Sequence, residues 1–324
     1  MRKKIKKGIS CLAVLAMLFS VWSIPVFAQP NDNETHSILT WTNDGKVTVE
    51  QYSENIWQVR QQRVKHAYLP NISDNNIYKK SLQTTRGLIT SQEKVNTQEH
   101  PYCAVGYLEA YFDWDQDGSI EDADRYSPIT STAFLEAEDI VLTAAHAVYS
   151  RQLDAWAQKV LFYPGYDKER YPYTVQTSSL VIEISIGTDY VNGVDYSDWA
   201  ICQIADDFGS SRGWLGLSTS PEEELEVTLA GYPGNDEYVD VGCQYITHGE
   251  IIEVVNEKFF YSSNYSFHGY SGGPIYYSGG LVIGIAAVSA GDSSANVNTG
   301  ATAFPDWLFD MILEKCDESA ERWG

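Results

Sequence analysis

The stretch Gly269-Tyr270-Ser271-Gly272-Gly273-Pro274 places a serine between glycines. Glycine adopts backbone conformations that other residues reach only with strain, so this stretch predicts a tight turn that exposes the serine hydroxyl. Backbone N–H groups in such a turn can converge on one point and stabilise a negatively charged oxygen there. A serine among glycines is usually only a turn, however, so the rest of the chain has to decide its role.

Two other short segments supply the partners that a reactive serine needs. Thr143-Ala144-Ala145-His146 ends an apolar run with a histidine, and Asp198-Trp199-Ala200-Ile201 begins another with a carboxylate. Serine is a poor nucleophile until a base removes its proton, and a histidine does this well when a buried carboxylate fixes its tautomer. Asp195 is a rival carboxylate, but Asp198 is preferred because the apolar run follows it directly.

Taken together and in this order, the three segments resemble the signatures of trypsin-like serine proteases. Other parts of the sequence resemble the bacterial glutamyl endopeptidase branch. They are His100-Pro101-Tyr102, residues 230–234 (Ala-Gly-Tyr-Pro-Gly) and Gly249-Glu250-Ile251. The likeness covers about residues 87–317. It implies an all-β fold of two perpendicular six-stranded antiparallel β-barrels with a C-terminal α-helix, and an active site in the cleft between the barrels.

The resemblance also implies roles for individual residues. His146 is expected to be the general base and then the general acid, Asp198 its orienting carboxylate, and Ser271 the nucleophile. Backbone N–H groups of Gly269 and Ser271 are expected to form the oxyanion hole, and the substrate is expected to be a protein or peptide. Tyr270 departs from the family pattern, in which Asp, Asn or Gln usually precedes the nucleophile.

Substrate specificity stays open on sequence alone. Glutamate-specific relatives carry a histidine in the strand that lines the primary pocket, where this chain has Ala286. Ser266 and His268 are candidates to hydrogen-bond an acidic side chain, whereas a pocket of small residues floored by Tyr265 would suit an apolar one equally. Ser289 is a further candidate lining residue. The excess of acidic residues would also repel an acidic substrate unless the ionic strength is high.

Two other classes of protein compete with this interpretation. One is a protease-fold protein without activity that serves as an extracellular binding module; Tyr270 mildly favours it, whereas intact His146, Asp198 and Ser271 argue against it. The other is a secreted esterase, which would normally carry the order Ser, Asp, His on an α/β fold. The order here is therefore wrong for that class.

A separate motif spans residues 113–124, Asp-Trp-Asp-Gln-Asp-Gly-Ser-Ile-Glu-Asp-Ala-Asp. Its carboxylates and its glycine stand where a twelve-residue calcium loop has its ligands and its sharp turn. Its flanks look like strands, so a structural Ca²⁺ loop grafted onto a hairpin is predicted; an acidic, solvated hairpin tip is the alternative. The expected ligands are Asp113, Asp115, Asp117, the carbonyl group of Ser119, Glu121 and Asp124.

The N-terminal part divides into two segments. Residues 1–28 have five basic residues, an apolar run and small residues before a cleavage point, which is typical of a secretory signal peptide. We therefore expect a secreted protein; a retained membrane anchor is the alternative. Residues 29–86 carry seven basic and six acidic residues, whereas residues 87–324 carry ten and 38. This change predicts a pro-segment before the protease domain, or else an ordinary extension, with cleavage after Arg86 and with Lys80 and Lys94 as alternatives.

The composition excludes several partners. The 324 residues carry a net charge of −22, and nucleic-acid affinity comes mainly from Lys and Arg, so no nucleic-acid partner is expected. No run after the signal peptide is apolar enough to cross a membrane, and we expect a monomer. After removal of the signal peptide, the cysteines allow zero, one or two disulfide bonds, and a disulfide bond is expected in an exported chain. They are Cys103, Cys202, Cys243 and Cys316, of which Cys202 is the candidate for a buried free thiol.

Short apolar runs separated by turn residues support the all-β interpretation. Only the end of the chain has helical spacing, with Pro305 in the first turn and Trp307, Phe309 and Ile312 on one face. Residues 286–302 are rich in small residues and predict a surface loop. The predicted strands are residues 104–112, 140–143, 200–204, 227–232, 251–255 and 281–288.

Overall fold

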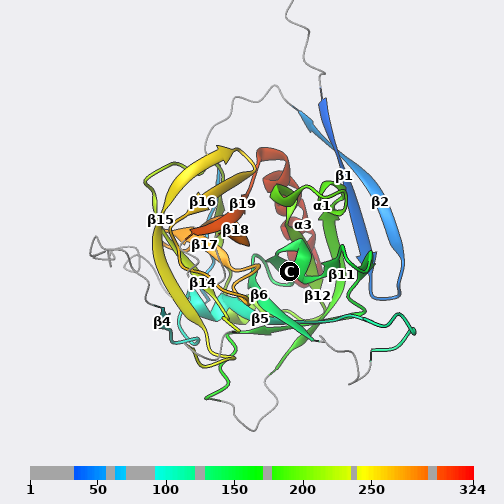
Figure 1. The fold of residues 1–324 in the computed structure, drawn as a ribbon, viewed down its shortest axis with the longest axis horizontal. Helices are drawn as coiled ribbons and strands as arrows, with labels where there is room; N and C mark the ends of the chain where they lie inside the picture. Colours follow the sequence, from blue (N-terminus) through cyan, green and yellow to red (C-terminus); the bar gives the residue numbers. More distant parts are fainter. Residues whose placement is uncertain are drawn as a thin grey trace, which may run out of the picture.

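The computed structural model describes residues 33–55, 63–70, 92–120, 128–170, 177–234, 239–290 and 298–324. The predicted signal peptide, the cleavage points at Lys80 and Arg86, and the predicted ligands Glu121 and Asp124 lie outside these residues. The described residues form two β-barrels that lie side by side, with a helix at the C-terminal end (Figure 1).

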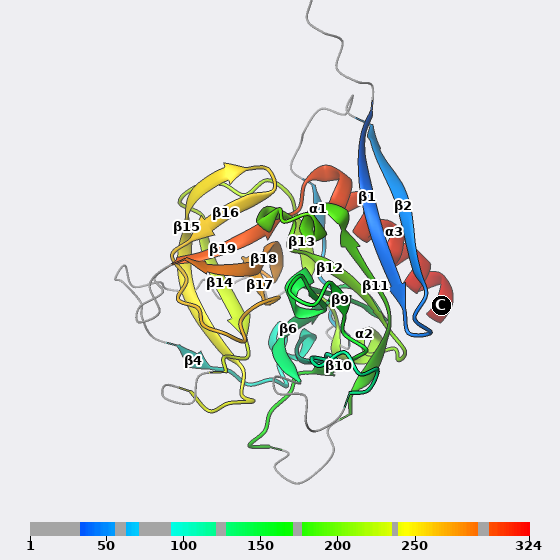
Figure 2. The ribbon, with the colours of Figure 1, turned by 45° about the vertical axis from the view of Figure 1, so that its right-hand side comes forward.

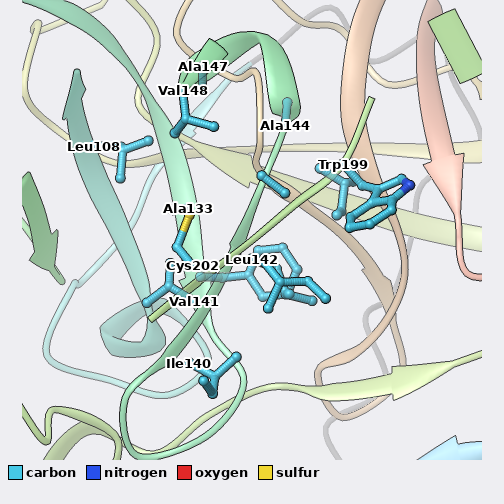
Figure 3. Close-up of a cluster of buried hydrophobic side chains, with 14 of the residues drawn as sticks. Leu108, Ala133, Ile140, Val141, Leu142, Ala144, Ala147, Val148, Trp199 and Cys202 are labelled. Carbon is cyan, nitrogen blue, oxygen red and sulfur yellow. The ribbon is translucent and has the colours of Figure 1, made fainter. Parts of the chain in front are cut away.

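The first barrel is a closed sheet of six antiparallel strands. Buried and partly exposed positions alternate along β5, whereas β7 is buried along its whole length. Leu108, Val141, Leu142 and Cys202 belong to the buried apolar cluster around these strands (Figure 3). The strand order is β10 (Lys159–Pro164), β5 (Val105–Tyr111), β6 (Ile129–Leu135), β7 (Ile140–Thr143), β12 (Ala200–Ile204) and β11 (Ser179–Gly187), and β11 pairs back with β10.

The second barrel repeats this plan with its own core, in which Leu229, Phe260 and Ile275 are fully buried. Two closed six-stranded antiparallel barrels therefore confirm the predicted all-β fold. The strand order is β17 (Pro274–Tyr277), β14 (Glu226–Gly231), β15 (Tyr245–Asn256), β16 (Phe259–Ser262), β19 (Asn298–Ala303) and β18 (Leu281–Ala290), with β17 closing onto β18.

Smaller elements extend or connect the barrels. β13 (Gly216–Ser218) adds to β18, and β4 (Glu93–Lys94) adds to β15. The others are β8 (Tyr149–Ser150), β9 (Ala155–Trp156), the helices α1 (Thr188–Val191) and α2 (Gly209–Arg212), and the short 3-10 turns η2 (Tyr102–Ala104), η3 (Ala145–Ala147) and η4 (Asp195–Ser197).

The C-terminal helix α3 (Asp306–Trp323) confirms the predicted helix. Pro305 precedes the helix as its N-cap residue, just before the predicted first turn. One face is buried against the first barrel, where Trp307, Phe309 and Ile312 point into the core. No helix among the described residues is long and apolar enough to cross a membrane.

The prediction of a surface loop over residues 286–302 is wrong at both ends of that range, where the structure has strands. β18 continues to Ala290, and β19 begins at Asn298. The small residue at Gly300 is explained by an aromatic ring of β16 that packs against β19: a Cβ atom there would lie 2.7 Å from the ring of Phe259. At this position the absence of a side chain makes room for a ring and does not indicate a loop.

The N-terminal residues form more structure than the sequence predicted. β1 (Asn33–Thr42) and β2 (Val47–Asn55) form a hairpin whose first strand pairs antiparallel with β11, and β3 (Val64–Lys65) pairs with β13. The hairpin lies at the outer edge of the first barrel, beside α3 (Figure 2). Part of the predicted pro-segment thus belongs to both sheets.

Among the described residues the expected disulfide bond is not formed, and the four cysteines there are free and buried. Each thiol sits in a different part of the fold with its own surroundings. The thiol of Cys103 donates to the carbonyl group of Arg212 at 3.1 Å, whereas that of Cys316 lies on α3 against the carbonyl group of Glu136. Cys202, the candidate free thiol, is in the interior of the first barrel.

Candidate active site

His146 and Asp198 meet at the end of the first barrel that faces the second. His146 lies in the turn η3, directly after β7, where Ala144 and Ala145 are fully buried and leave room for the backbone to turn. Its ring Nδ1 lies 2.6 Å from Asp198 Oδ2, and its backbone N–H donates to Asp198 Oδ1 at 2.9 Å. One buried carboxylate thus fixes both the backbone and the ring of one histidine.

This pairing determines the protonation of the ring. A carboxylate can only accept, so Nδ1 carries a hydrogen and Nε2 is left as the acceptor. Burial lowers the pKa of His146, but the charge of Asp198 and its hydrogen bond raise it more, and the net pKa lies above its ordinary value. The His146 side chain keeps 34% exposure, so the ring is only partly covered by the protein.

Asp195, the rival carboxylate, is placed elsewhere. Its side chain is 74% exposed and pairs with Arg151, whose Nη1 lies 2.7 Å from Asp195 Oδ1. The guanidinium group of Arg151 also stacks over the ring of Tyr190 at 3.8 Å from its centroid. Asp198, and not Asp195, is therefore the carboxylate that pairs with His146.

The turn around Ser271 depends on two glycines with positive φ. Gly269 has φ +98°, and a Cβ atom there would lie 2.2 Å from the carbonyl oxygen of Tyr232. Gly272 has φ +81°, and a Cβ atom there would lie 3.0 Å from the backbone nitrogen of Ala144. The turn that follows Ser271 therefore packs directly on the segment that carries His146.

The backbone N–H groups of this turn differ in whether they have an acceptor within the protein. The N–H of Gly272 donates to Ala286 and that of Gly273 to Tyr270, both within the turn and its neighbouring strand. Within the described part of the chain, the N–H groups of Gly269 and Ser271 donate to no backbone carbonyl group. These are the two groups that the sequence predicted as oxyanion donors.

Thr132 on β6 holds this turn from the opposite barrel, and the sequence did not reveal it. Its N–H donates to the carbonyl group of Ser271 at 2.8 Å, and its Oγ1 donates to the carbonyl group of Gly269 at 2.6 Å. The same Oγ1 accepts from the N–H of Tyr232 at 2.9 Å, and Thr143 Oγ1 donates to the Thr132 carbonyl group. A threonine in a buried strand carries no sequence signal for this role.

A small pocket opens beside Ser271. Of the predicted pocket residues, Ser266 and Ala286 line it, whereas His268 is exposed and Tyr265 packs edge-on against Phe267. Ser289 pairs with Thr299 in the strands, and its side chain lies outside the described ones. No charged side chain is among the described residues of the lining, which are Ser266, Phe267, Tyr270, Ser271, Ala286, Ala287 and Thr299.

Tyr270, which departs from the family pattern, is almost completely buried. Its hydroxyl donates to Gln92 Oε1 at 3.1 Å, and burial raises its pKa well above the ordinary value, so the phenol stays neutral. A neutral hydrogen bond therefore braces the residue before Ser271. Its partner Gln92 lies six residues after Arg86, the predicted cleavage point.

The acidic loop at residues 113–120 follows the end of β5. Carboxylate oxygens of Asp113, Asp115 and Asp117 lie within 4.8 Å of one another, and Gly118 has φ +91° as the sharp turn requires. N–H groups of Gly118 and Ser119 donate to the Asp113 and Asp117 carboxylates at 2.8 and 2.9 Å. Three clustered hard oxygens are the ligand type that Ca²⁺ prefers, so the described part of the loop, residues 113–120, fits that ion.

Comparison with known families decides the relationship. A model of the trypsin family matches residues 89–308, which is most of the chain and includes His146, Asp198 and Ser271. This chain belongs to the trypsin family. The match also begins close to the predicted start of the protease domain at residue 87.

Solved structures show the same fold for this trypsin-family chain. A Glu endopeptidase in complex with MPD superposes with a TM-score of 0.58 at 21% identity, covering 71% of this chain and 100% of that chain. The protease Anisep from Arthrobacter nicotinovorans gives a TM-score of 0.53 at 14% identity, covering 68% of this chain and 96% of that one. The thermostable serine protease AL20 from an extremophilic microorganism gives 0.53 at 14%, covering 67% and 97%. Comparison with curated proteins gives no match.

Proposed function

We propose that this trypsin-family chain is a secreted serine endopeptidase that is made as a zymogen and stabilised by calcium. The observation that carries the proposal is the pairing of His146 with the buried Asp198, because it leaves Nε2 unprotonated in a segment on which the turn after Ser271 packs. Members of this family act on proteins or peptides, which makes a peptide bond the expected target.

In the proposed reaction, Ser271 Oγ attacks the carbonyl carbon of the scissile peptide bond and its proton passes to His146 Nε2. The new oxyanion is held by the N–H groups of Gly269 and Ser271, and Asp198 stabilises the charged imidazole ring. His146 then protonates the leaving amine nitrogen, the C–N bond breaks, and an acyl-enzyme remains. Water repeats the sequence, with His146 as its base, and releases the acid product and the free serine.

The lining of the pocket favours an uncharged side chain before the scissile bond. An acidic side chain needs a cation or several donors to replace its hydration, and the described lining residues include no cation. The hydroxyl of Thr299 lies 2.8 Å from both Ser266 Oγ and the carbonyl group of Asn264, so that hydroxyl is already engaged. We therefore propose a preference for small or apolar residues over glutamate.

Labelling with a fluorophosphonate serine probe tests the proposal. Processed wild-type protein should be labelled, Ser271→Ala should not, and Ser210→Ala, at an exposed serine in α2, should be labelled like the wild type. Cleavage-site profiling on a peptide library then reads the specificity. Labelling that persists in Ser271→Ala, or none in correctly processed wild type, would refute the assignment of the nucleophile.

A further inference from the structure

We propose that residues 33–70 stay bound to the protease body after activation cleavage, as a noncovalent second chain that completes the fold and leaves the active site open. The inference deepens the proposed function, because it assumes that the chain is cleaved between this segment and the body. Here the N-terminal segment means residues 33–55 and 63–70, and the body means residues 92–324 as far as they are described.

The first contact is made by the hairpin on the edge of β11. β10 pairs only with Ser179 and Leu180 at the start of that strand, and β1 takes the remaining edge, from Thr42 opposite Glu183 to Ile38 opposite Gly187. An uncovered strand edge exposes unpaired N–H and C=O groups, and natural sheets protect such edges. The body alone would expose this edge, so the hairpin supplies strand pairing that the body lacks.

The hairpin also buries rings against α3. The imidazole ring of His36 stacks on the indole ring of Trp307 with centroids 3.9 Å apart and an interplanar angle of 13°. Trp307 in turn meets the ring of Trp199, edge to face at 5.8 Å, and Trp199 is the residue after Asp198. Ile38 and Trp41 of the same strand are buried in the core of the first barrel. Loss of the hairpin would therefore expose apolar surface that supports the segment carrying Asp198.

The second contact is a buried ion pair between Lys65 and Glu136. Glu136 has no exposed surface, and its Oε1 lies 2.8 Å from Lys65 Nζ, which also donates to the Glu136 carbonyl group. Burial raises the pKa of Glu136 to about 7 even though the Lys65 charge opposes this rise. Removing one partner of a buried pair leaves an uncompensated charge, which is strongly destabilising. The body thus contains a carboxylate whose cation comes from the N-terminal segment.

The third contact is a close approach between the backbone of the N-terminal segment and two glycines of the body. A Cβ atom at Gly216 would lie 2.4 Å from the carbonyl oxygen of Lys65, and one at Gly213 would lie 2.3 Å from that of Tyr68. The backbones of Tyr68 and Trp214 exchange two hydrogen bonds of 3.1 Å, and their rings stack at 4.3 Å. Two glycines of the body therefore stand where only the absence of a side chain lets this segment approach.

These contacts lie away from the proposed active site. The residues that line the pocket beside Ser271 include none from 33–55 or 63–70, and the described hydrogen bonds of His146 go to Asp198. The N-terminal segment is therefore not a plug over the described site. Among the described contacts, the packing of His36 on Trp307 and of Trp307 on Trp199 connects this segment to the residue next to Asp198.

The test uses the full chain carrying Ser271→Ala, so that self-digestion is absent, with residues 83–86 replaced by the recognition sequence of a specific protease. After that cut, native size-exclusion chromatography with intact-mass analysis should show both pieces in one peak, and they should separate only under denaturing conditions. Elution of the body alone, folded and with an unchanged melting temperature, would overturn the proposal.

Variants show which contact retains the segment. Lys65→Met should release the cut segment about tenfold faster than the parent, and Lys65→Met with Glu136→Gln should restore much of the retention, since no charge is then buried alone. Lys46→Met, at the exposed tip of the hairpin, is the matched control, and each uncut variant is first checked for cooperative unfolding. Equal release from Lys65→Met and Lys46→Met would overturn the role of the ion pair.

The result is independent of peptidase activity. Retention is measured with Ser271→Ala, whereas the cut chain with intact Ser271 is labelled with the fluorophosphonate probe in parallel. Retention without labelling would contradict the proposed function alone, and labelling that requires loss of the N-terminal segment would contradict the inference alone.

Discussion

The two carboxylate oxygens of Asp198 bind the backbone N–H and the ring of His146. This pairing determines how activity should depend on pH. Because the net pKa of His146 is raised, kcat/KM should increase with pH as the ring loses its proton, with a midpoint above 6.5. Asp198→Asn removes the charge that raises this pKa. We expect the midpoint of the His146 ring titration, followed by NMR, to fall, and kcat to drop on the order of 10⁴-fold.

Asp195→Asn is the matched control for this prediction. Its side chain is exposed and pairs with Arg151, so the variant should keep nearly the wild-type kcat and the same titration midpoint for His146. A large loss of kcat in Asp195→Asn, with normal activity in Asp198→Asn, would show that the carboxylates have been assigned in the wrong order.

Thr132 supports a second prediction at the scale of single residues. Thr132→Val removes the hydroxyl that binds both Gly269 and the N–H of Tyr232, and leaves those buried groups unsatisfied at a cost of about 1–3 kcal/mol each. Because Gly269 also supplies a proposed oxyanion donor, kcat should fall at least about tenfold while KM changes little. Thr132→Ser keeps the hydroxyl and should restore kcat. A loss of stability with unchanged kcat would mean that Thr132 is only structural.

Local sequence patterns pointed to some residues of the candidate site and missed others, for a physical reason. Ser271, His146 and Asp198 each lie in a short segment whose neighbours already prepare a turn or a strand start. Thr132 and the pairing of Tyr270 with Gln92 depend on contacts across distances of more than 100 residues, which no local pattern records.

At the scale of elements, the acidic loop after β5 predicts a response to calcium. Chelation should lower the melting temperature of wild type and added Ca²⁺ should restore it, because an ion that binds only the folded form adds about 2.7 kcal/mol at 100 times its Kd. Asp117→Asn should weaken this response. Asp317→Asn, at an exposed carboxylate on α3, should keep it. A melting curve that ignores chelation would remove calcium from the proposed function.

Whether an element could be predicted from the sequence also depends on how distant in the sequence its contacts are. α3 was predicted because its apolar stripe repeats with helical period and needs no knowledge of its partner. The hairpin of β1 and β2 was missed because its buried residues are few and its partner β11 lies about 140 residues further along the chain. The small residue at Gly300 was misjudged because the ring of Phe259 that requires it lies on another strand.

At the scale of the whole molecule, the net charge of the chain changes at residue 86. The packed fold, however, includes residues from both sides of this point. Residues 29–86 are nearly neutral and residues 87–324 carry a balance of −28, yet Lys65 and Glu136 join the two parts inside the fold. Composition therefore predicted a boundary in the chain, whereas the boundary of the packed unit depends on contacts that composition does not record.

The same charge imbalance predicts how substrates approach. The balance of −28 over residues 87–324 attracts basic peptides and repels acidic ones over a Debye length of about 30 Å at 0.01 M salt, but over only about 8 Å at 0.15 M. Three peptides with one scissile sequence and distant Lys, Gln or Glu flanks separate this effect from pocket specificity. Raising salt at constant calcium should lower kcat/KM for the Lys peptide, raise it for the Glu peptide, and leave the Gln peptide nearly unchanged, with changes of several-fold. Equal salt responses for all three would show that the acidic surface does not steer substrate, and that discrimination lies within the pocket beside Ser271.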